Sequence, residues 1–463
     1  MNLKDLDLPY DLEIVKSNST QNKLGYFLYD PSTKKILDSF NSTEAFIPAS
    51  TCKILSAVFA LKVLGADYRF KTYLSYTGTI KNEILEGNLY LKGTGDPTLS
   101  ISHLIDFASK MVNQGVRELR GKFYFDESHS IPSTCIQSPR EPWANYNCGI
   151  SALSLDFNQA RLKWDRKTEQ EEYYFIPDSL TDKVIRLENE LPLETNILYQ
   201  PKDNLWLLSA AEPAMGEKKV PIKKPAEYTA NFFRKICGLY GIKLSTPLTG
   251  EMPEQASIFH VHESNTLVNL VESMLEYSNN FMAEQIQIAA SRQLLNRSIG
   301  IEEAAKIMQE WFLQQIPLTN WNSINLKNGS GLNAGNRITP EQLASILEFA
   351  DSQNYSNRCF QSLLPAAGWQ GSLVQRFTEP EVAFRIWAKP GAMNYVYAYA
   401  GYLFKPGGKK LIYSILINNF ARRAAVDVVS EPLPNEVIEH AQLWTKSALD
   451  LVEGIQRAWV TGS

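Results

Sequence analysis

The first part of the chain changes from a strand-like to a helix-like spacing of apolar residues. Residues 24–30 (LGYFLYD) and 36–40 (ILDSF), separated by the turn-forming PSTKK, predict a β-hairpin. After Pro48, apolar side chains recur at helical spacing, at Ile54, Leu55, Val58, Phe59 and Leu61. The pattern therefore predicts a helix that begins near Ser50 and ends before Gly65.

The middle of the chain is rich in short strand patterns separated by turns. Residues 88–100 (NLYLKGTGDPTLS) read as a strand that ends in a tight Gly/Asp/Pro turn. Helical periodicity is found at 103–116 and 227–241, and the second of these helices precedes a predicted strand at 242–245 (IKLS). From 152 to 211 short alternating patterns dominate, so we expect an accessory region of two small subdomains.

The last part of the chain predicts helices followed by the strands of a sheet. Helical spacing continues through Leu295, and residues 382–389, 394–404 and 410–420 then predict three strands. An amphipathic helix is expected at 435–459. A front hairpin with three strands and a helix at the back indicates an α+β fold, with one antiparallel sheet built from both ends of the chain.

Composition and charge exclude several functional classes. The 463 residues are too many for one compact core, and 44% apolar and 21% charged side chains are ordinary for a globular protein. A net charge of -4 argues against a nucleic-acid partner, and the apolar stretches are too short or too charged for a transmembrane segment. Among five cysteines without a CxxC pair, Cys135 and Cys148 can pair in an exported protein, but buried free thiols are the default expectation.

The predicted helix start carries the first candidate for catalysis. Ser50 and Lys53 are three residues apart, so they share one face of the helix, and the helix dipole favours a developing oxyanion near Ser50. A desolvated, neutral lysine amine can take the proton of a serine hydroxyl. Cys52 lies about 200° around the helix from Ser50, so it should face away into packing. The same spacing at Ser32 and Lys35 falls in a turn, and the bland alternative at Ser50 is an N-cap serine.

Two more motifs follow in chain order. Ser278 and Asn280 interrupt a helical region and predict an interhelical corner that projects a hydroxyl and an amide. Lys389 ends an apolar strand, and Gly391 allows another backbone to approach closely. An ordinary turn would explain each of these alone. Together S-x-x-K, S-x-N and K-x-G match the three motifs of β-lactamases and penicillin-binding proteins.

Six segments narrow the resemblance to one family. PASTCKILSAVFAL, GTGDPTL, SALSLDFN, YSNNFMAEQI, NGSGLNAGNRITP and LPAAGWQGSLVQRF resemble signature segments of the class C low-molecular-mass penicillin-binding proteins. Members of this family are D-alanyl-D-alanine carboxypeptidases/endopeptidases of peptidoglycan. The resemblance implies a serine acyl-transferase domain with an antiparallel sheet flanked by helices, at residues 1–66 and 263–463. It further implies an accessory domain at 67–157 and 225–262, with a second one, 158–224, nested inside it.

The resemblance also assigns roles to the motif residues. Ser50 would be the nucleophile, Lys53 its base, Ser278 a proton shuttle to the leaving amine, and Asn280 a ligand of the substrate's amide. No metal or cofactor is implied. A periplasmic or cell-wall location is implied, so we expect an export signal to have been removed from this form, and a homodimer is compatible with the resemblance.

The third motif departs from the family's K-T-G pattern. Lys389 would supply positive potential, Pro390 and Gly391 would line the substrate, and backbone N–H groups of Ser50 and Ala392 would form the oxyanion hole. The family's K-T-G is normally followed by another Thr or Ser, whereas here the segment reads Lys389-Pro390-Gly391-Ala392-Met393. The missing hydroxyls are those expected to bind a terminal carboxylate, which favours endopeptidase over carboxypeptidase action. Two further departures replace a usual aspartate, at Asn279 in the second motif and at Asn328 in NGSGL.

We therefore expect a serine D,D-peptidase that acts on stem peptides and is acylated by β-lactams. The alternative is a weak or inactive homologue that binds peptidoglycan peptides or partner proteins. A β-lactamase or esterase ranks last because no motif supplies a deacylating carboxylate. The histidines offer no second mechanism: only His260 and His262 share a strand face, where an exposed strand is favoured over a metal site.

Overall fold

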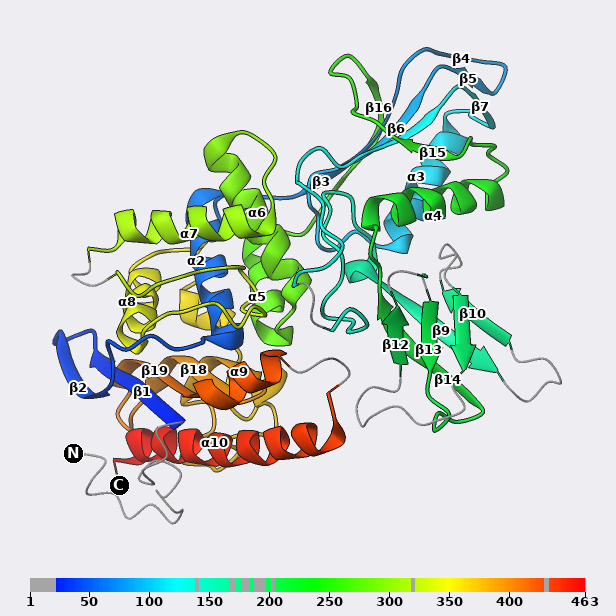
Figure 1. Ribbon diagram of the computed structural model, residues 1–463. Helices are drawn as coiled ribbons and strands as arrows, with labels where there is room; N and C mark the ends of the chain where they lie inside the picture. Colours follow the sequence, from blue (N-terminus) through cyan, green and yellow to red (C-terminus); the bar gives the residue numbers. More distant parts are fainter. Residues whose placement is uncertain are drawn as a thin grey trace. The chain divides into compact units, whose positions relative to one another are not determined.

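The computed structural model describes residues 22–137, 141–165, 172–176, 183–186, 197–200, 203, 205–317, 321–428 and 433–462 (Figure 1). The N-terminal stretch MNLKDLDLPYDLEIVKSN lies outside the described residues. The chain forms two compact units: residues 1–67, 267–283 and 301–463 make the first, and 68–266 and 284–300 the second. Among the described helices, none is both long and apolar enough to cross a membrane.

The first unit is organised around a five-stranded antiparallel sheet assembled from both ends of the chain, as predicted. Its strand order is β17-β18-β19-β1-β2. Asn22 of β1 pairs with Asn419 of β19, so chain segments nearly four hundred residues apart form the centre of the sheet. The strands are β1 (Asn22–Asp30), β2 (Lys35–Phe40), β17 (Ile386–Met393), β18 (Val396–Phe404) and β19 (Lys410–Asn419).

Helices cover both faces of this sheet. Side chains alternate along a strand, so Leu24, Tyr26 and Leu28 of β1 face the C-terminal helix α10 (Asn435–Thr461) and share its apolar core. On the opposite face, Ser414 of β19 donates a hydrogen bond to the Pro340 carbonyl at the start of α8 (Pro340–Asp351). The remaining helical segments of this unit are η2 (Ala49–Cys52), α2 (Lys53–Val63), α5 (Leu267–Tyr277), α7 (Ile301–Gln315), η4 (Phe360–Leu363), η5 (Gly371–Leu373) and α9 (Phe420–Val428).

The second unit contains a mixed five-stranded sheet with the order β15-β8-β6-β3-β16. Helices α3 (Ile101–Asn113) and α4 (Pro225–Leu239) share its core, where Phe107, Phe123 and Phe233 meet. Helix α6 (Asn280–Leu295) contributes its first four residues to the first unit and the rest to the second. The strands are β3 (Lys71–Tyr76), β6 (Leu89–Gly93), β8 (Phe123–Asp126), β15 (Pro247–Thr249) and β16 (Ser257–Glu263).

Three small sheets complete the second unit, with strand orders β4-β5-β7, β10-β9-β14 and β11-β13-β12. Their strands are β4 (Thr79–Lys81), β5 (Ile84–Glu86), β7 (Glu118–Arg120), β9 (Gln159–Asp165), β10 (Glu172–Ile176), β11 (Lys183–Arg186), β12 (Ile197–Gln200), β13 (Leu205–Leu208) and β14 (Met215–Pro221), and a short helix η3 (Asp156–Asn158) precedes β9. The expected strand-rich middle is therefore confirmed. Its division into two nested domains stays a prediction.

Two strand predictions were wrong at their edges. Residues 242–245 form no strand but only an isolated bridge between Lys243 and Glu118; the Ser245 hydroxyl accepts the Phe123 N–H at 3.0 Å, and β15 begins at Pro247. The strand predicted from 382 begins only at Ile386, because the preceding residues form a turn in which Phe384 has φ 62°. A positive φ at a bulky residue interrupts an extended strand.

Candidate active site

Ser50 lies in the first helical turn after Pro48, within η2. The residue before it, Ala49, has φ 46°, a left-handed conformation that is unfavourable for a residue with a side chain. Thr51 fixes this turn, because its hydroxyl donates to the Pro48 carbonyl at 2.7 Å. The predicted helix is confirmed from Ala49 onward, with its first turn wound as a 3₁₀ helix.

Lys53 is the centre of the site. Its side chain is fully buried, and its Nζ contacts three oxygens: Ser50 Oγ at 3.0 Å, Asn280 Oδ1 at 2.7 Å and the Ser330 carbonyl at 2.7 Å. These oxygens belong to three separate segments of the first unit. The spacing argument correctly placed Lys53 on the face of Ser50.

The geometry around Lys53 Nζ suits both protonation states of the amine. An ammonium can donate one N–H to each of the three oxygens. A neutral amine can donate to Asn280 and Ser330 while its lone pair accepts the hydroxyl proton of Ser50. The amine can therefore receive a proton from Ser50 without a change in its heavy-atom contacts, which is what a general base requires.

The corner between α5 and α6 delivers Asn280 to Lys53. Ser278, in the turn, has φ 54°, and the Asn279 side chain accepts the Met282 N–H at 3.0 Å and so caps α6. Asn279 thus performs the capping role that an aspartate also fills. The structure thus brings Ser50, Lys53 and Asn280 into direct contact, and Ser278 lies two residues before Asn280 in the same corner.

Lys389 is buried on β17, where its Nζ donates to the Pro390 carbonyl at 2.9 Å. Burial, together with the positive charge of Lys53, holds the pKa of Lys389 well below that of a free lysine. The two amines are therefore close enough to influence each other. A second positive charge on the pair is disfavoured, so Lys389 can carry the single charge when Lys53 is neutral.

Gly391 permits the close approach of β17 to the Ser50 turn. A side chain at this position would place its Cβ 2.6 Å from the Ser50 nitrogen and 3.0 Å from the Thr51 nitrogen. Contacts this short do not occur for a real Cβ, so only glycine fits without a backbone shift. The predicted close approach at Gly391 is confirmed.

The neighbours of Gly391 lie along an open sheet edge, because β17 is the terminal strand of its sheet. Pro390 opposes Tyr399 of β18, and a proline in a ladder must turn its nitrogen away from the partner strand. Backbone N–H groups two residues apart point the same way, so the N–H of exposed Ala392 also faces this edge. An oxyanion donor is thus available there, while Pro390 contributes none.

The segment 328–331 supplies a contact that the sequence did not reveal. The Ser330 carbonyl accepts from Lys53, and the Gly329 carbonyl accepts from Ser56 at 2.8 Å. Gly331 has φ 81°, and a Cβ there would lie 1.8 Å from the Ala49 carbonyl oxygen. NGSGL was noticed as a signature segment, but its partner atom on Lys53 is a backbone carbonyl, which any residue carries.

Other candidate residues take no part in this cluster. Cys52 is fully buried, as predicted, and its Sγ contacts the Asn328 carbonyl. Cys135 and Cys148 are free thiols, and burial raises the pKa of Cys148 to about 12. His262 is half-buried rather than exposed and stacks on His103 at 3.8 Å. Across the described residues, no group of three metal-ligating side chains could hold a metal ion.

Comparison with known proteins gives one family. The model of the D-Ala-D-Ala carboxypeptidase 3 (S13) family matches residues 12–433. D-alanyl-D-alanine carboxypeptidase DacB of Haemophilus influenzae is 24% identical, covering 89% of this chain and 90% of the relative. D-alanyl-D-alanine carboxypeptidase of Actinomadura sp. (strain R39) is 26% identical, covering 87% of this chain and 79% of the relative.

Solved structures share the fold. The crystal structure of penicillin binding protein 4 (dacB) from Haemophilus influenzae has a TM-score of 0.77 at 21% identity, covering 94% of this chain and 99% of that one. The same protein complexed with a novel β-lactam has a TM-score of 0.74 at 21% identity, covering 95% and 99%. The predicted α+β fold of the penicillin-binding-protein type is therefore confirmed.

The environment of Asn328 predicts the effect of restoring an aspartate there. Asn328 is buried, and its Oδ1 accepts the Gly331 N–H at 3.2 Å and the Asn336 Nδ2–H at 2.8 Å, whereas its own Nδ2 has no partner in the described chain. We expect Asn328→Asp to leave the free energy of unfolding within about 1 kcal/mol of wild type, because several N–H donors already stabilise an acceptor.

The matched change Asn328→Ala should cost about 1–3 kcal/mol, because it leaves those donors unsatisfied. Urea unfolding of both variants measures the difference. Equal destabilisation by the two substitutions would contradict the network described for Asn328.

Proposed function

Because the chain belongs to the D-Ala-D-Ala carboxypeptidase 3 (S13) family, we propose that it is a serine D,D-peptidase that cleaves peptidoglycan stem peptides through an acyl-enzyme on Ser50. The observation that carries the proposal is the buried Lys53 amine, 3.0 Å from Ser50 Oγ and held by two further oxygens. A hydroxyl beside a positioned amine is the arrangement of an activated nucleophile.

In the acylation step, Ser50 Oγ attacks the carbonyl carbon of the D-alanine whose amide joins it to a terminal D-alanine or to the amine of a crosslink, and transfers its proton to Lys53 Nζ. The N–H groups of Ser50 and Ala392 stabilise the oxyanion of the tetrahedral intermediate. Ser278 passes a proton to the leaving amine, the C–N bond breaks, and water then hydrolyses the ester. The Ser278 hydroxyl takes up this proton-transfer role when substrate is bound.

Substrate recognition falls to Asn280, Lys389 and the open edge of β17. The Asn280 side chain holds the substrate's amide, and Lys389 supplies positive potential. Pro390 offers neither a hydroxyl nor an N–H at the edge where a terminal carboxylate would bind. This favours cleavage of crosslinks, in which that carboxylate is distant or absent, over removal of a free terminal D-alanine.

Two further properties belong to this proposal. The structure of a relative complexed with a β-lactam supports acylation of Ser50 by β-lactams. Peptidoglycan as substrate places the protein in the periplasm or at the cell wall of a bacterium, and a homodimer remains compatible with it. The second candidate function, a weak or inactive binder of peptidoglycan peptides, is favoured by Pro390 alone.

Labelling with fluorescent penicillin tests the nucleophile. We expect stoichiometric covalent labelling of the wild-type chain and none of Ser50→Ala, read by gel fluorescence and intact mass. Ser32→Ala is the matched control, because Ser32 and Lys35 have the same spacing but lie in a turn, where Ser32 bonds Asp30 at 2.6 Å. Labelling that survives in Ser50→Ala would refute the proposed nucleophile; labelling without cleavage of a crosslinked muropeptide would select the binder.

The contact between Asn280 and Lys53 predicts a change in pH dependence. Asn280→Asp places a carboxylate 2.7 Å from the Lys53 amine and favours its protonated form, in which it cannot act as a base. We expect acylation at pH 7 to fall about tenfold or more and to recover as pH rises, since a nearby opposite charge moves such a titration by about 1–3 units. Stopped-flow acylation rates at about five pH values between about 6 and 10 measure this pH dependence.

Asn279→Asp is the control, because the same chemical change there falls on the cap of α6. It should keep the wild-type pH profile. An alkaline shift in both variants, or in neither, would contradict the role given to the Asn280 contact.

Pro390 predicts the balance between the two cleavage reactions. We expect Pro390→Thr to raise carboxypeptidase activity on a free D-Ala-D-Ala end relative to endopeptidase activity, by about tenfold, the value of one added hydrogen bond to a charged group. Digestion of defined crosslinked and uncrosslinked muropeptides, read by mass spectrometry, gives both rates. An unchanged ratio would remove Pro390 as the determinant of the substrate.

A further inference from the structure

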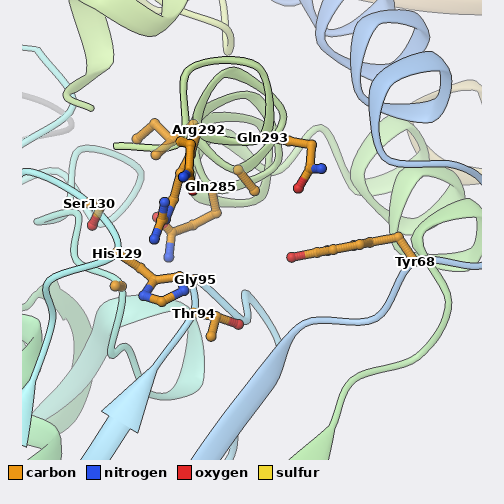
Figure 2. Close-up of a pocket in the computed structure, with 12 residues that line it drawn as sticks. Tyr68, Thr94, Gly95, His129, Ser130, Gln285, Arg292 and Gln293 are labelled. Atoms are coloured by element: carbon orange, nitrogen blue, oxygen red, sulfur yellow. The ribbon is translucent and has the colours of Figure 1, made fainter. Parts of the chain in front are cut away.

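A cavity of about 330 Å³ lies wholly within the second unit and includes no residue of the proposed catalytic site. Its walls come from the segment before β3, the turn after β6, the segment between β8 and η3, and α6 with the residue that follows it; Figure 2 labels eight of the lining residues. The exposed residues Gln293 and Asn296 belong to its lining, so solvent reaches it. Its size falls in the range of small-molecule sites.

The lining of this cavity is polar and contains buried groups without partners. The Ser130 hydroxyl, on a residue only 5% exposed, and the His129 Nδ1 have no hydrogen-bond partner in the described chain. Buried polar atoms are normally paired, so two such atoms beside one cavity indicate that a ligand or water completes them. Gln285, fully buried, is held in place by its bond to the Ser151 carbonyl at 2.8 Å.

The charge of the cavity is set by one guanidinium. Arg292 lies on α6 among the twelve lining residues, which include no aspartate or glutamate, and it forms no ion pair with the described residues. Burial and the positive charges of Arg292 and Lys92 lower the pKa of His129 to about 4, although Asp126 opposes them, so His129 is neutral at pH 7. Lys92 is itself paired with Asp126 at 3.0 Å.

The arrangement of the side chains around this charge is visible in Figure 2. Arg292, Gln285, His129 and Ser130 gather on one side, and the Tyr68 hydroxyl points toward them from the other. One guanidinium balances a single negative charge and can bind a carboxylate through two parallel hydrogen bonds. The surrounding amides and hydroxyls offer neutral hydrogen bonds, and Tyr68 offers an aromatic ring, which together suit a hydroxylated ligand.

We propose that this cavity is a second, non-catalytic binding site for a sugar that carries one carboxylate, with the carboxylate on Arg292 and the sugar's hydroxyl and amide groups on Ser130, His129 and Gln285. Thr94 and Gly95, from the segment GTGDPTL, line the site. This gives a use to a signature segment that the catalytic cluster does not employ. The site requires no chemistry at Ser50, so it stands independently of the proposed function.

Calorimetric titration of the full chain with N-acetylmuramic acid tests the proposal. N-Acetylglucosamine, which lacks the lactyl carboxylate, is the matched neutral ligand, and inorganic phosphate is the simple anion. We expect the acidic sugar to bind at one site, at least about tenfold more tightly than either probe, because a charge-assisted pair is lost with the neutral sugar. Equal affinity for the two sugars, phosphate binding as tight as the acidic sugar, or no binding would overturn the assignment.

Variants locate the binding. Arg292→Gln should weaken the acidic sugar about tenfold or more, and Ser130→Ala should weaken it by a smaller factor. Arg297→Gln removes the same charge from an exposed residue outside the lining and should bind as wild type does. Melting temperatures report whether each variant folds, and a crystal soaked with the sugar must show it at Arg292. Undiminished binding by a folded Arg292→Gln would refute the site, whereas Ser50→Ala should bind normally whatever its activity.

Discussion

The fully buried amine of Lys53 is the constraint on which the rest of the first unit depends. A buried amine is costly unless oxygen atoms surround it, and here the oxygens come from the Ser50 turn, the α5–α6 corner and the loop at Ser330. Asn280 and Ser330 lie more than two hundred residues along the chain from Lys53, so secondary structure alone cannot bring them together. The sheet built from both chain ends and helix α2, which is buried from Lys53 to Leu61, hold these segments in register.

The convergence of these segments on Lys53 requires strained backbone conformations at some positions and glycine at others. Ala49 lies directly before Ser50 and Ser278 two residues before Asn280, and both adopt left-handed conformations, which persist only where surrounding packing determines them. Gly331 and Gly391 provide the complementary solution, since each lies too close to the Ser50 turn for any Cβ. The Ser50 turn is thus preceded by a strained residue, Ala49, and is approached by two glycines from distant segments of the chain.

The sequence predicted those parts of the site that follow from local periodicity. Helical phase placed Lys53 beside Ser50 and turned Cys52 away, and apolar patterns gave the strands of the main sheet. Contacts made by backbone atoms were invisible, because the Ser330 carbonyl carries no signal in its side chain. The cavity at Arg292 was equally inaccessible, since its walls join residues from 68 to 296 through tertiary packing. The predicted strand at 242–245 is absent for a related reason, because the Ser245 hydroxyl accepts the Phe123 N–H, a tertiary contact that periodicity does not reveal.

The three departures from the family pattern have unequal physical consequences. Asn279 and Asn328 each replace a carboxylate, yet each still presents the acceptor oxygen that its position uses, one at the cap of α6 and one at the turn after Gly329. The substitutions therefore exchange a charge for a neutral amide without breaking the local network. Pro390 differs in kind, because it offers neither a hydroxyl nor a backbone donor on the outer edge of the terminal strand β17. Gly391 packs against the Ser50 turn and the Lys389 side chain is buried, so neither neighbour replaces the groups that Pro390 lacks. Of the three departures, Pro390 is therefore the one that changes the hydrogen-bonding groups available on this strand.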